Sequence, residues 1–182
     1  MIFPCSLMTI SMNDTVNASQ IDFRIDELSG DQRYISRFLM KHWGSHMVVT
    51  RGRIHDASAL PGYAAFLGED IVGLITYNIE EGNCEIVTLN SSIKGVGIGT
   101  ALLKAVEMHA IDQNCTRLWL ITTNDNQPAL DLYQRRGYKI AAIHHDAIKE
   151  SRKIKPEIPL YGIDSIPIRD EIEFELDLSK PR

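Results

Sequence analysis

The sequence predicts one α+β domain built on a mostly antiparallel sheet, with a strand–helix–strand crossover in the middle. Three observations favour this fold class. Short β-type runs follow one another between residues 63 and 89, with hairpin-turn sequences between them. A glycine-rich loop then joins a strand to a helical pattern, and the apolar run RLWLITT follows at Arg117–Thr123. A chain of 182 residues is long enough for one such domain with a full hydrophobic core.

Residues 1–20 are predicted to be a disordered leader, and residues 21–182 to form the domain. The leader has a few apolar residues but neither a basic start nor a long apolar stretch, so it does not resemble a signal peptide. Met8 or Met12 could be the true start of the protein.

A strand and a helix are expected at the start of the domain. Ile21–Leu28 alternates apolar and polar residues, as a half-buried strand does. Ser29 and Gln32 have the spacing of a capping box, in which each side chain satisfies an unpaired amide at the start of a helix. This helix is predicted to stop at Gly44 and to bury one face, formed by Ile35, Phe38, Leu39 and His42.

The middle of the chain is predicted to be an antiparallel meander. Met47–Val49 could form a short strand before a loop that contains Arg51 and Arg53. The strands of the meander are expected at Tyr63–Leu67, Ile71–Ile79 and Cys84–Leu89. The sequences GED and EEGN between them are typical of hairpin turns.

The second half is predicted to alternate helices and strands. The helix after the glycine loop has apolar residues at helical spacing, namely Leu102, Leu103, Val106, Ala110 and Ile111. Asn114 suits the left-handed C-cap of that helix, and Arg117–Thr123 is typical of a central strand buried on both faces. Asn126 is the predicted N-cap of the next helix, which tolerates Pro128 in its first turn and ends at Gly137. The remaining elements are a strand at Tyr138–Ile143, a helix at Asp146–Ile154, a proline-containing loop at Lys155–Pro167 and a strand at Glu171–Leu178.

Composition excludes several classes of protein. With 44% apolar residues, 24% charged residues and a formal net charge of −5, the chain lacks the basic balance of a sequence-independent nucleic-acid binder. Its three cysteines, Cys5, Cys84 and Cys115, are far apart and odd in number. They predict neither a disulfide framework nor a zinc site, and they favour a reducing cytoplasm. No apolar run approaches the roughly 18 residues needed to span a bilayer.

The glycines at 95, 97 and 99 predict an anion-binding loop. Backbone N–H groups at a helix start are unpaired, and glycine lets an anion approach them closely. A P-loop would need a lysine directly after Gly99 and then a serine or threonine, and Thr100 and Ala101 stand at these two positions instead. A dinucleotide fingerprint would need another glycine spacing and an acidic residue after the next strand, where Thr122 and Thr123 stand instead. Both nucleotide interpretations therefore fail.

Two motifs resemble those of a known superfamily. The segment from Lys94 to Gly99, KGVGIG, resembles the [RQ]-x-x-G-x-[GA] pyrophosphate loop of the GNAT acyl-CoA-dependent N-acyltransferases, with lysine in place of arginine or glutamine. The pattern Asn126-x-x-Ala129-x-x-x-Tyr133-x-x-x-Gly137-Tyr138 is similar to their second signature. The element order from Ile21 to Ile143 also matches. More narrowly, RGRIHDASALPG, CEIVTLNS, LWLITTNDN and IPIRDEIEFEL look like a bacterial subfamily whose acceptor is unassigned.

This resemblance implies the GNAT fold and acetyl-CoA as co-substrate. The fold is a mixed, mostly antiparallel twisted sheet of six to seven strands, with helices on both faces and splayed central parallel strands. Val87 and Leu89 would hydrogen-bond the pantetheine arm, and a backbone N–H there would be the oxyanion donor. Asn126 would contact pantetheine or only cap its helix. The residues implied to hold the CoA pyrophosphate are Lys94, Gly95, Val96, Gly97, Ile98, Gly99 and Thr100.

The resemblance also implies catalytic roles. An alkyl amine with a pKa near 10 keeps its proton at neutral pH, so a general base helps the transfer. Glu85 is the first candidate and would act through a water, although a glutamate beside a hairpin turn is usually solvated. Tyr133 would protonate the departing CoA thiolate, or it is a core tyrosine. Of His144 and His145, which face opposite ways on a strand, at most one could be a second-choice base.

The sequence therefore predicts an N-acetyltransferase that moves an acetyl group to a primary amine of a small molecule or protein by direct attack. The alternatives are a non-catalytic acyl-CoA sensor, a transferase of a longer acyl group, and an interaction protein that has lost its cofactor. Metal binding is not predicted, because Gly44 interrupts the His42–His46 spacing and no third ligand is apparent. No nucleic-acid or membrane partner is predicted, and the final strand could pair across a homodimer.

Overall fold

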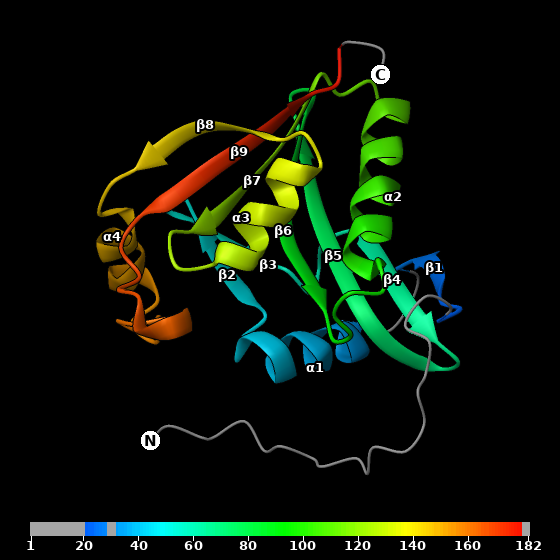
Figure 1. The fold of residues 1–182 in the computed structure, drawn as a ribbon, viewed down its shortest axis with the longest axis horizontal. Helices are drawn as coiled ribbons and strands as arrows, with labels where there is room; N and C mark the ends of the chain where they lie inside the picture. The colour runs from blue at the N-terminus through cyan, green and yellow to red at the C-terminus, as the bar shows by residue number, and fades with distance from the viewer. Residues whose placement is uncertain (1–20, 29–31, 180–182) are drawn as a thin grey trace.

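The computed structural model describes residues 21–28 and 32–179 as a seven-stranded sheet with helices on both faces (Figure 1). The strand order is β1-β4-β5-β6-β7-β9-β8. The strands are β1 (Arg24–Glu27), β4 (Gly62–Leu67), β5 (Asp70–Glu80), β6 (Asn83–Ser91), β7 (Arg117–Thr123), β8 (Lys139–His144) and β9 (Glu171–Asp177). The α-helices are α1 (Gln32–Trp43), α2 (Ile98–Asp112), α3 (Gln127–Arg135) and α4 (Ala147–Ile154). The predicted leader and the Ser29 cap lie outside the described residues.

A separate hairpin, formed by β2 (Met47–Thr50) and β3 (Arg53–Asp56), lies between α1 and the meander in the chain. The short strand predicted at Met47–Val49 is confirmed, but the loop predicted after it is wrong from Arg53 onward. Residues 53–56 pair antiparallel with β2 in continuous register. The turn between the strands uses Arg51 and Gly52, whose φ angles are 50° and 73°. A left-handed turn of this kind allows a tight hairpin, and only its glycine is a sequence signal.

The predicted meander β4-β5-β6 is antiparallel throughout, as expected. Two irregularities interrupt it, one between β4 and β5 after Ala65 and one between β5 and β6. In the second, Thr76 pairs with Thr88 while the next residue, Tyr77, pairs with Ile86. Val87 is therefore the extra residue of a β-bulge, which bends β6 and increases its twist.

The parallel pair β6–β7 holds together at one end only. Asn83–Ile86 pairs with Arg117–Leu120, but β6 continues to Ser91 and β7 to Thr123 without further pairing between them. Within the described residues the two strands therefore separate after Ile86, directly before the bulge. The splayed parallel strands implied by the resemblance are present.

Helices cover the sheet on both faces and create two apolar cores. Side chains of α2 and α3 pack on one face around Phe174, which is fully buried. Side chains of α1, including Phe38 and Leu39, pack on the other face around Leu74. Ile111 was expected in the first core, yet it is 54% exposed. Ala110, the residue before it, ends the buried stripe of α2. Because a helix turns about 100° per residue, Ile111 points to solvent.

The expectation that β7 is buried on both faces is wrong. Its residues alternate between buried and half-buried along the whole strand. Leu118 and Leu120 face the core beneath α3, while Trp119 and Ile121 line the opposite and more open face. An open face beside a buried core is where a second substrate can reach the sheet.

The last strand lies inside the sheet and not at its edge. β9 pairs with β7 on one side and with β8 on the other. Its backbone groups are thus used within the chain, so the suggested pairing of the final strand across a homodimer is wrong. No helix in the described ranges 21–28 and 32–179 is both long and apolar enough to cross a membrane.

Candidate active site

The glycine loop opens α2 with unpaired amides. Gly95 and Gly97 have φ angles of 80° and 87°, which glycine adopts without strain. Gly97 is the N-cap, and its carbonyl accepts the first helical hydrogen bond from the Ala101 amide at 2.9 Å. The amides at the start of the helix have no intrahelical acceptor. A Cβ at Gly95 or Gly97 would meet no described atom within 4 Å, so the loop faces open space. This arrangement fits an anion.

Two apolar side chains of this loop, those of Val96 and Ile98, pack against the core. Ile98 is 1% exposed, and a Cβ on Gly73 would press against its side chain, so only the Ile98 amide is available to a ligand. Val96 packs on the same core. Lys94 is exposed and can add positive charge at the loop. The loop is thus fixed from beneath by apolar packing while its amides remain open.

The splay between β6 and β7 leaves one edge of β6 without a strand partner. Val87 is the bulge residue and Leu89 pairs only with Ile75 of β5. Backbone groups that face the gap toward β7 therefore need another partner, because buried backbone donors and acceptors are almost always paired. An extended pantetheine arm is chemically suited to fill that gap.

Asn126 caps α3 as predicted, since its Oδ1 accepts a hydrogen bond from the Ala129 amide at 3.3 Å. The two residues before it, Asn124 and Asp125, accept hydrogen bonds from the segment between α4 and β9. Asn124 Oδ1 accepts from the amides of Arg169 and Asp170 at 2.8 and 2.9 Å. Asp125 Oδ2 accepts from the Ile163 amide at 3.1 Å. The NDN sequence therefore ties the loop after α4 to the end of β7.

Gly162→Ala should disrupt this connection. The φ of Gly162 is −110°, which any residue adopts, but an added Cβ would collide with the Asp125 carboxylate and lie 3.1 Å from Ile168. Overpacking of this kind costs about 1–3 kcal/mol, and we expect a matching fall in the free energy of unfolding measured in urea. Gly99→Ala is the control, because its Cβ would meet only Leu132 at an ordinary 3.7 Å. Equal stability of the two variants would contradict this account.

Tyr133 lies on the α3 face of the sheet in an aromatic cluster. Its ring is 5.8 Å from that of Tyr138 and 5.6 Å from that of Phe174, and the residue is 6% exposed. Burial raises the pKa of Tyr133, so its hydroxyl stays protonated at neutral pH. Within the described part of the chain this hydroxyl has no hydrogen-bond acceptor. A protonated hydroxyl of this kind suits a proton donor.

Glu85 is buried, whereas a glutamate beside a hairpin turn usually lies at the surface. It is 3% exposed, and Thr50 Oγ1 donates a hydrogen bond to its Oε1 at 2.7 Å. His55 Nε2 lies 3.6 Å from its Oε2. Burial raises the pKa of Glu85, while the Thr50 hydrogen bond and the nearby His55 oppose that shift. A buried carboxyl with a raised pKa is a typical general base.

The register places Glu85 and Tyr133 on opposite faces of the sheet. Glu85 pairs with Trp119, and Trp119 pairs with Glu175, so these three side chains share a face. Phe174, beside Glu175 in β9, points the other way and contacts Tyr133. A group in the gap after Ile86 would therefore have the carboxylate on one side and the phenol on the other.

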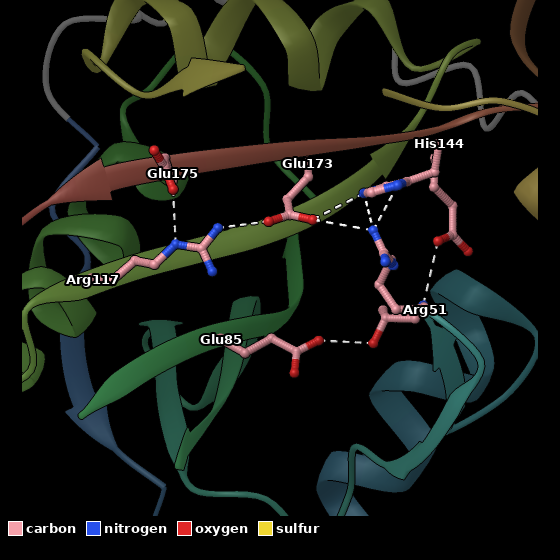
Figure 2. Close-up of polar contacts among 8 residues, drawn as sticks. Arg51, Glu85, Arg117, His144, Glu173 and Glu175 are labelled. Atoms are coloured by element: carbon pink, nitrogen blue, oxygen red, sulfur yellow. Dashed lines mark hydrogen bonds and ion pairs between the residues drawn. The ribbon is translucent and has the colours of Figure 1, made fainter. Parts of the chain in front are cut away.

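A chain of ion pairs crosses the same face as Glu85 (Figure 2). Arg117 donates to Glu175 at 2.8 Å and to Glu173 at 2.6 Å. Glu173 also contacts His144 at 2.9 Å and Arg51 at 3.4 Å, and Arg51 contacts His144. Burial opposes ionisation of Glu173, but hydrogen bonds from His144 and Arg117 lower its pKa. These contacts fasten the β2–β3 turn to β8 and β9.

Of the two adjacent histidines, only His144 belongs to this face. His145 has a side chain that is 76% exposed and lies 3.5 Å from Asp170. Because His144 is engaged by Arg51 and Glu173, it is a structural contact more than a free base. Residues 21–28 and 32–179 contain no group of three or more potential ligands placed to hold a metal ion.

Two cavities lie on this side of the sheet. A cavity of about 220 Å³ is polar and includes Glu85, Trp119 and Asn83 in its wall. A larger one of about 650 Å³ lies between β1, α1 and the β4–β5 turn, and none of its described lining residues is a predicted site residue. The smaller cavity is the one that leads to the buried carboxylate, so it is the candidate acceptor entrance.

No pattern in the sequence predicted that Thr50 and His55 lie beside Glu85. Both lie in a segment with a weak secondary-structure pattern, and Thr50 is 35 positions from Glu85. In this part of the chain, Arg51 and Arg53 add positive charge, and the segment RGRIHDASALPG resembles the bacterial subfamily. That segment includes His55, but the resemblance assigns it no role. A threonine and a histidine within six residues of each other are too common to predict a contact with a distant glutamate.

Fold and site together support an acyltransferase: the parallel strands β6 and β7 splay apart, a glycine loop with unpaired amides follows β6, and Glu85 and Tyr133 are buried on opposite faces of the sheet. The model of the Acetyltransferase (GNAT) family matches residues 23–138. The chain belongs to the GNAT acetyltransferase family.

Three similar proteins are informative. The uncharacterized protein YxbD of Bacillus subtilis is 48% identical over 140 residues, which cover 76% of this chain and 87% of that protein. Among solved structures, an IAA acetyltransferase from Bacillus cereus has a TM-score of 0.69 at 20% identity, covering 86% of this chain and 99% of that one. A GNAT acetyltransferase from Elizabethkingia anophelis with acetyl-CoA bound has a TM-score of 0.65 at 19% identity, covering 87% and 99%. At these identities the two structures establish the shared fold.

Proposed function

We propose that this protein is an N-acetyltransferase that moves the acetyl group of acetyl-CoA to a primary amine by direct attack. The observation that supports this most is the gap between β6 and β7. The glycine loop lies at its open end, and Glu85 and Tyr133 approach from opposite faces at its closed end. A fold neighbour with acetyl-CoA bound supports the choice of donor.

In this proposal each group has one task. The amides at the start of α2, with Lys94, bind the pyrophosphate, and the free edge of β6 at Val87 and Leu89 binds the pantetheine arm. Glu85 accepts the ammonium proton through a water. The amine nitrogen then forms a bond to the acetyl carbon and the carbon–sulfur bond breaks. Tyr133 donates its proton to the CoA thiolate, and the second proton that the newly bonded nitrogen gives up restores the Tyr133 hydroxyl through water, so the CoA thiol and the acetylated amine are the products.

Acetyl-CoA should stabilise the folded protein. A ligand that binds only the native state adds about 2.7 kcal/mol at 100 times its dissociation constant, so the melting temperature should rise with acetyl-CoA concentration. Gly97→Ala should weaken this effect, because alanine at φ 87° costs about 1–2 kcal/mol and moves the helix start. Gly68→Ala is the matched control, since it also places alanine at a positive φ, 61°, with open space around its Cβ, but in the β4–β5 turn outside the glycine loop. No shift with millimolar acetyl-CoA would exclude the CoA assignment.

Turnover is tested by thiol release. A panel of primary amines is incubated with acetyl-CoA and the protein, and free CoA is detected with a thiol reagent. Succinyl-CoA and a longer acyl-CoA are run alongside. We expect release that depends on one class of amine and is fastest with acetyl-CoA. Binding of acetyl-CoA without release for any amine would favour a non-catalytic sensor instead.

A further inference from the structure

The β2–β3 hairpin provides both polar neighbours of the Glu85 carboxylate. Thr50, at the end of β2, donates to Oε1 at 2.7 Å, and His55, in β3, faces Oε2 at 3.6 Å. Thr50 and His55 are 6% and 7% exposed. All three side chains are thus removed from bulk water, and those of Thr50 and His55 are directed at the Glu85 carboxylate.

Packing alone does not explain this group. The Nε2 atom of His55 is buried and has no hydrogen-bond partner among the described residues. Leaving a polar atom in that state opposes folding, and an apolar side chain would fill the same space more favourably. A buried histidine nitrogen aimed at a buried carboxylate indicates a task connected with a proton.

The hairpin is also held firmly in place. The Arg51 amide donates to Glu171 Oε2 at 3.3 Å, and the Arg51 guanidinium contacts Glu173 and His144 (Figure 2). Glu171 is 1% exposed and also accepts a hydrogen bond from Ser151 of α4 at 3.0 Å. The turn between Thr50 and His55 is therefore fastened to β8, β9 and α4, which fixes the positions of both side chains.

We propose that Thr50 and His55 are positioning residues for the base Glu85, with Thr50 holding one carboxylate oxygen and His55 sharing the proton that the other oxygen receives. This inference rests on the proposed function. The ammonium proton passes through water to the Glu85–His55 pair and leaves from it to solvent after the acetylated amine departs. The titratable and charged groups that face Glu85 are His55 and Arg53 from β3 and Glu80 from β5. Arg53 is engaged by Glu80 at 2.8 and 2.9 Å, which leaves His55 as the proton partner.

The test measures the titration of Glu85 with and without turnover. The acidic limb of kcat/KM against pH is recorded for wild type, Thr50→Val, Thr50→Ser and His55→Gln. The Glu85 carboxyl is titrated in parallel by ¹³C NMR in the protein without substrates, its resonance being assigned by its loss in Glu85→Gln. Losing a hydrogen bond to an ionised carboxylate should raise its pKa by about one unit. We expect Thr50→Val to move the limb and the NMR titration upward by that amount, and His55→Gln to move both in the same direction, because the nearby His55 opposes the effect of burial on Glu85. Thr50→Ser, which keeps the hydroxyl, should leave both near their wild-type values.

Ser58→Ala is the matched control in the same hairpin region. Ser58 is buried, but its hydroxyl bonds Asp56 at 2.6 Å and not Glu85. It should leave the titration of Glu85 unchanged even if it lowers stability. An unchanged NMR titration in folded Thr50→Val and His55→Gln would overturn the proposal, whether or not the enzyme turns over. A shifted NMR titration without CoA release for any amine would uphold the contact with Glu85 and reject the proposed function.

Discussion

Tyr133→Phe should lower kcat by about 10²-fold or more, the usual contribution of a positioned general acid, while acetyl-CoA binding stays nearly unchanged. Phenylalanine keeps the ring that packs between Tyr138 and Phe174 and removes only the hydroxyl. Because burial raises the pKa of that hydroxyl, it is protonated throughout the neutral range and can supply a proton to the thiolate. Single-turnover kinetics and the acetyl-CoA thermal shift measure the two quantities separately.

Tyr138→Phe is the control for this substitution. Tyr138 belongs to the same aromatic cluster and is 3% exposed, but its hydroxyl donates to Glu107 at 3.3 Å. Its loss should cost about 1 kcal/mol of stability, as for a typical hydrogen bond, with little change in kcat. If Tyr133→Phe kept the wild-type rate, Tyr133 would be a core residue and the thiolate would take its proton from elsewhere.

Glu85→Gln should also reduce kcat/KM by about 10²-fold at neutral pH, because glutamine keeps the shape but cannot accept the proton. The pH dependence should change as well. Burial raises the pKa of Glu85 above the value near 4.3 of an exposed glutamate. The wild-type rate should therefore fall as the pH drops through this raised pKa, and the variant should lack that limb. Steady-state kinetics between about pH 5 and 9 would show both effects.

The same substitution should not destabilise the protein at neutral pH. A carboxyl whose pKa is higher in the folded than in the unfolded state binds more protons when folded, so stability falls as pH rises between the two values. Glutamine removes this cost and still accepts from Thr50. We expect the urea midpoint to be equal or higher for Glu85→Gln at pH 7. A large loss of stability would indicate a structural ion pair instead of a base.

Glu80→Gln separates the role of Glu85 from a general effect of charge. Glu80 is exposed at the end of β5, and hydrogen bonds from Arg53 lower its pKa to about 2. It is ionised over the whole assay range and cannot produce the acidic limb. We expect its variant to keep the acidic limb, moved slightly to lower pH because the negative charge of Glu80 helps to raise the pKa of Glu85. If Glu80→Gln lost the acidic limb as Glu85→Gln is expected to do, the limb would come from the combined charges that line the cavity and not from Glu85 alone.

The features that the sequence predicted well depend on neighbours in the chain. Asn126 caps α3 through the amide three residues later, and Asn114 has the left-handed φ of 58° expected after α2. The glycine loop has its positive φ angles because a strand must turn sharply into a helix there. Backbone chemistry of this kind is local, so residue type and spacing are enough to predict it.

By itself, then, the sequence determined the order of elements, the anion loop and the family signatures, all of which act over a few residues. Only the tertiary structure decided that Glu85 is buried, that β9 lies between β7 and β8, and that the β2–β3 hairpin contacts Glu85. Thr50 is 35 positions from Glu85, and Arg51 is 120 from Glu171. Such contacts depend on how the strands are ordered and which face each side chain meets, and no local pattern encodes that choice.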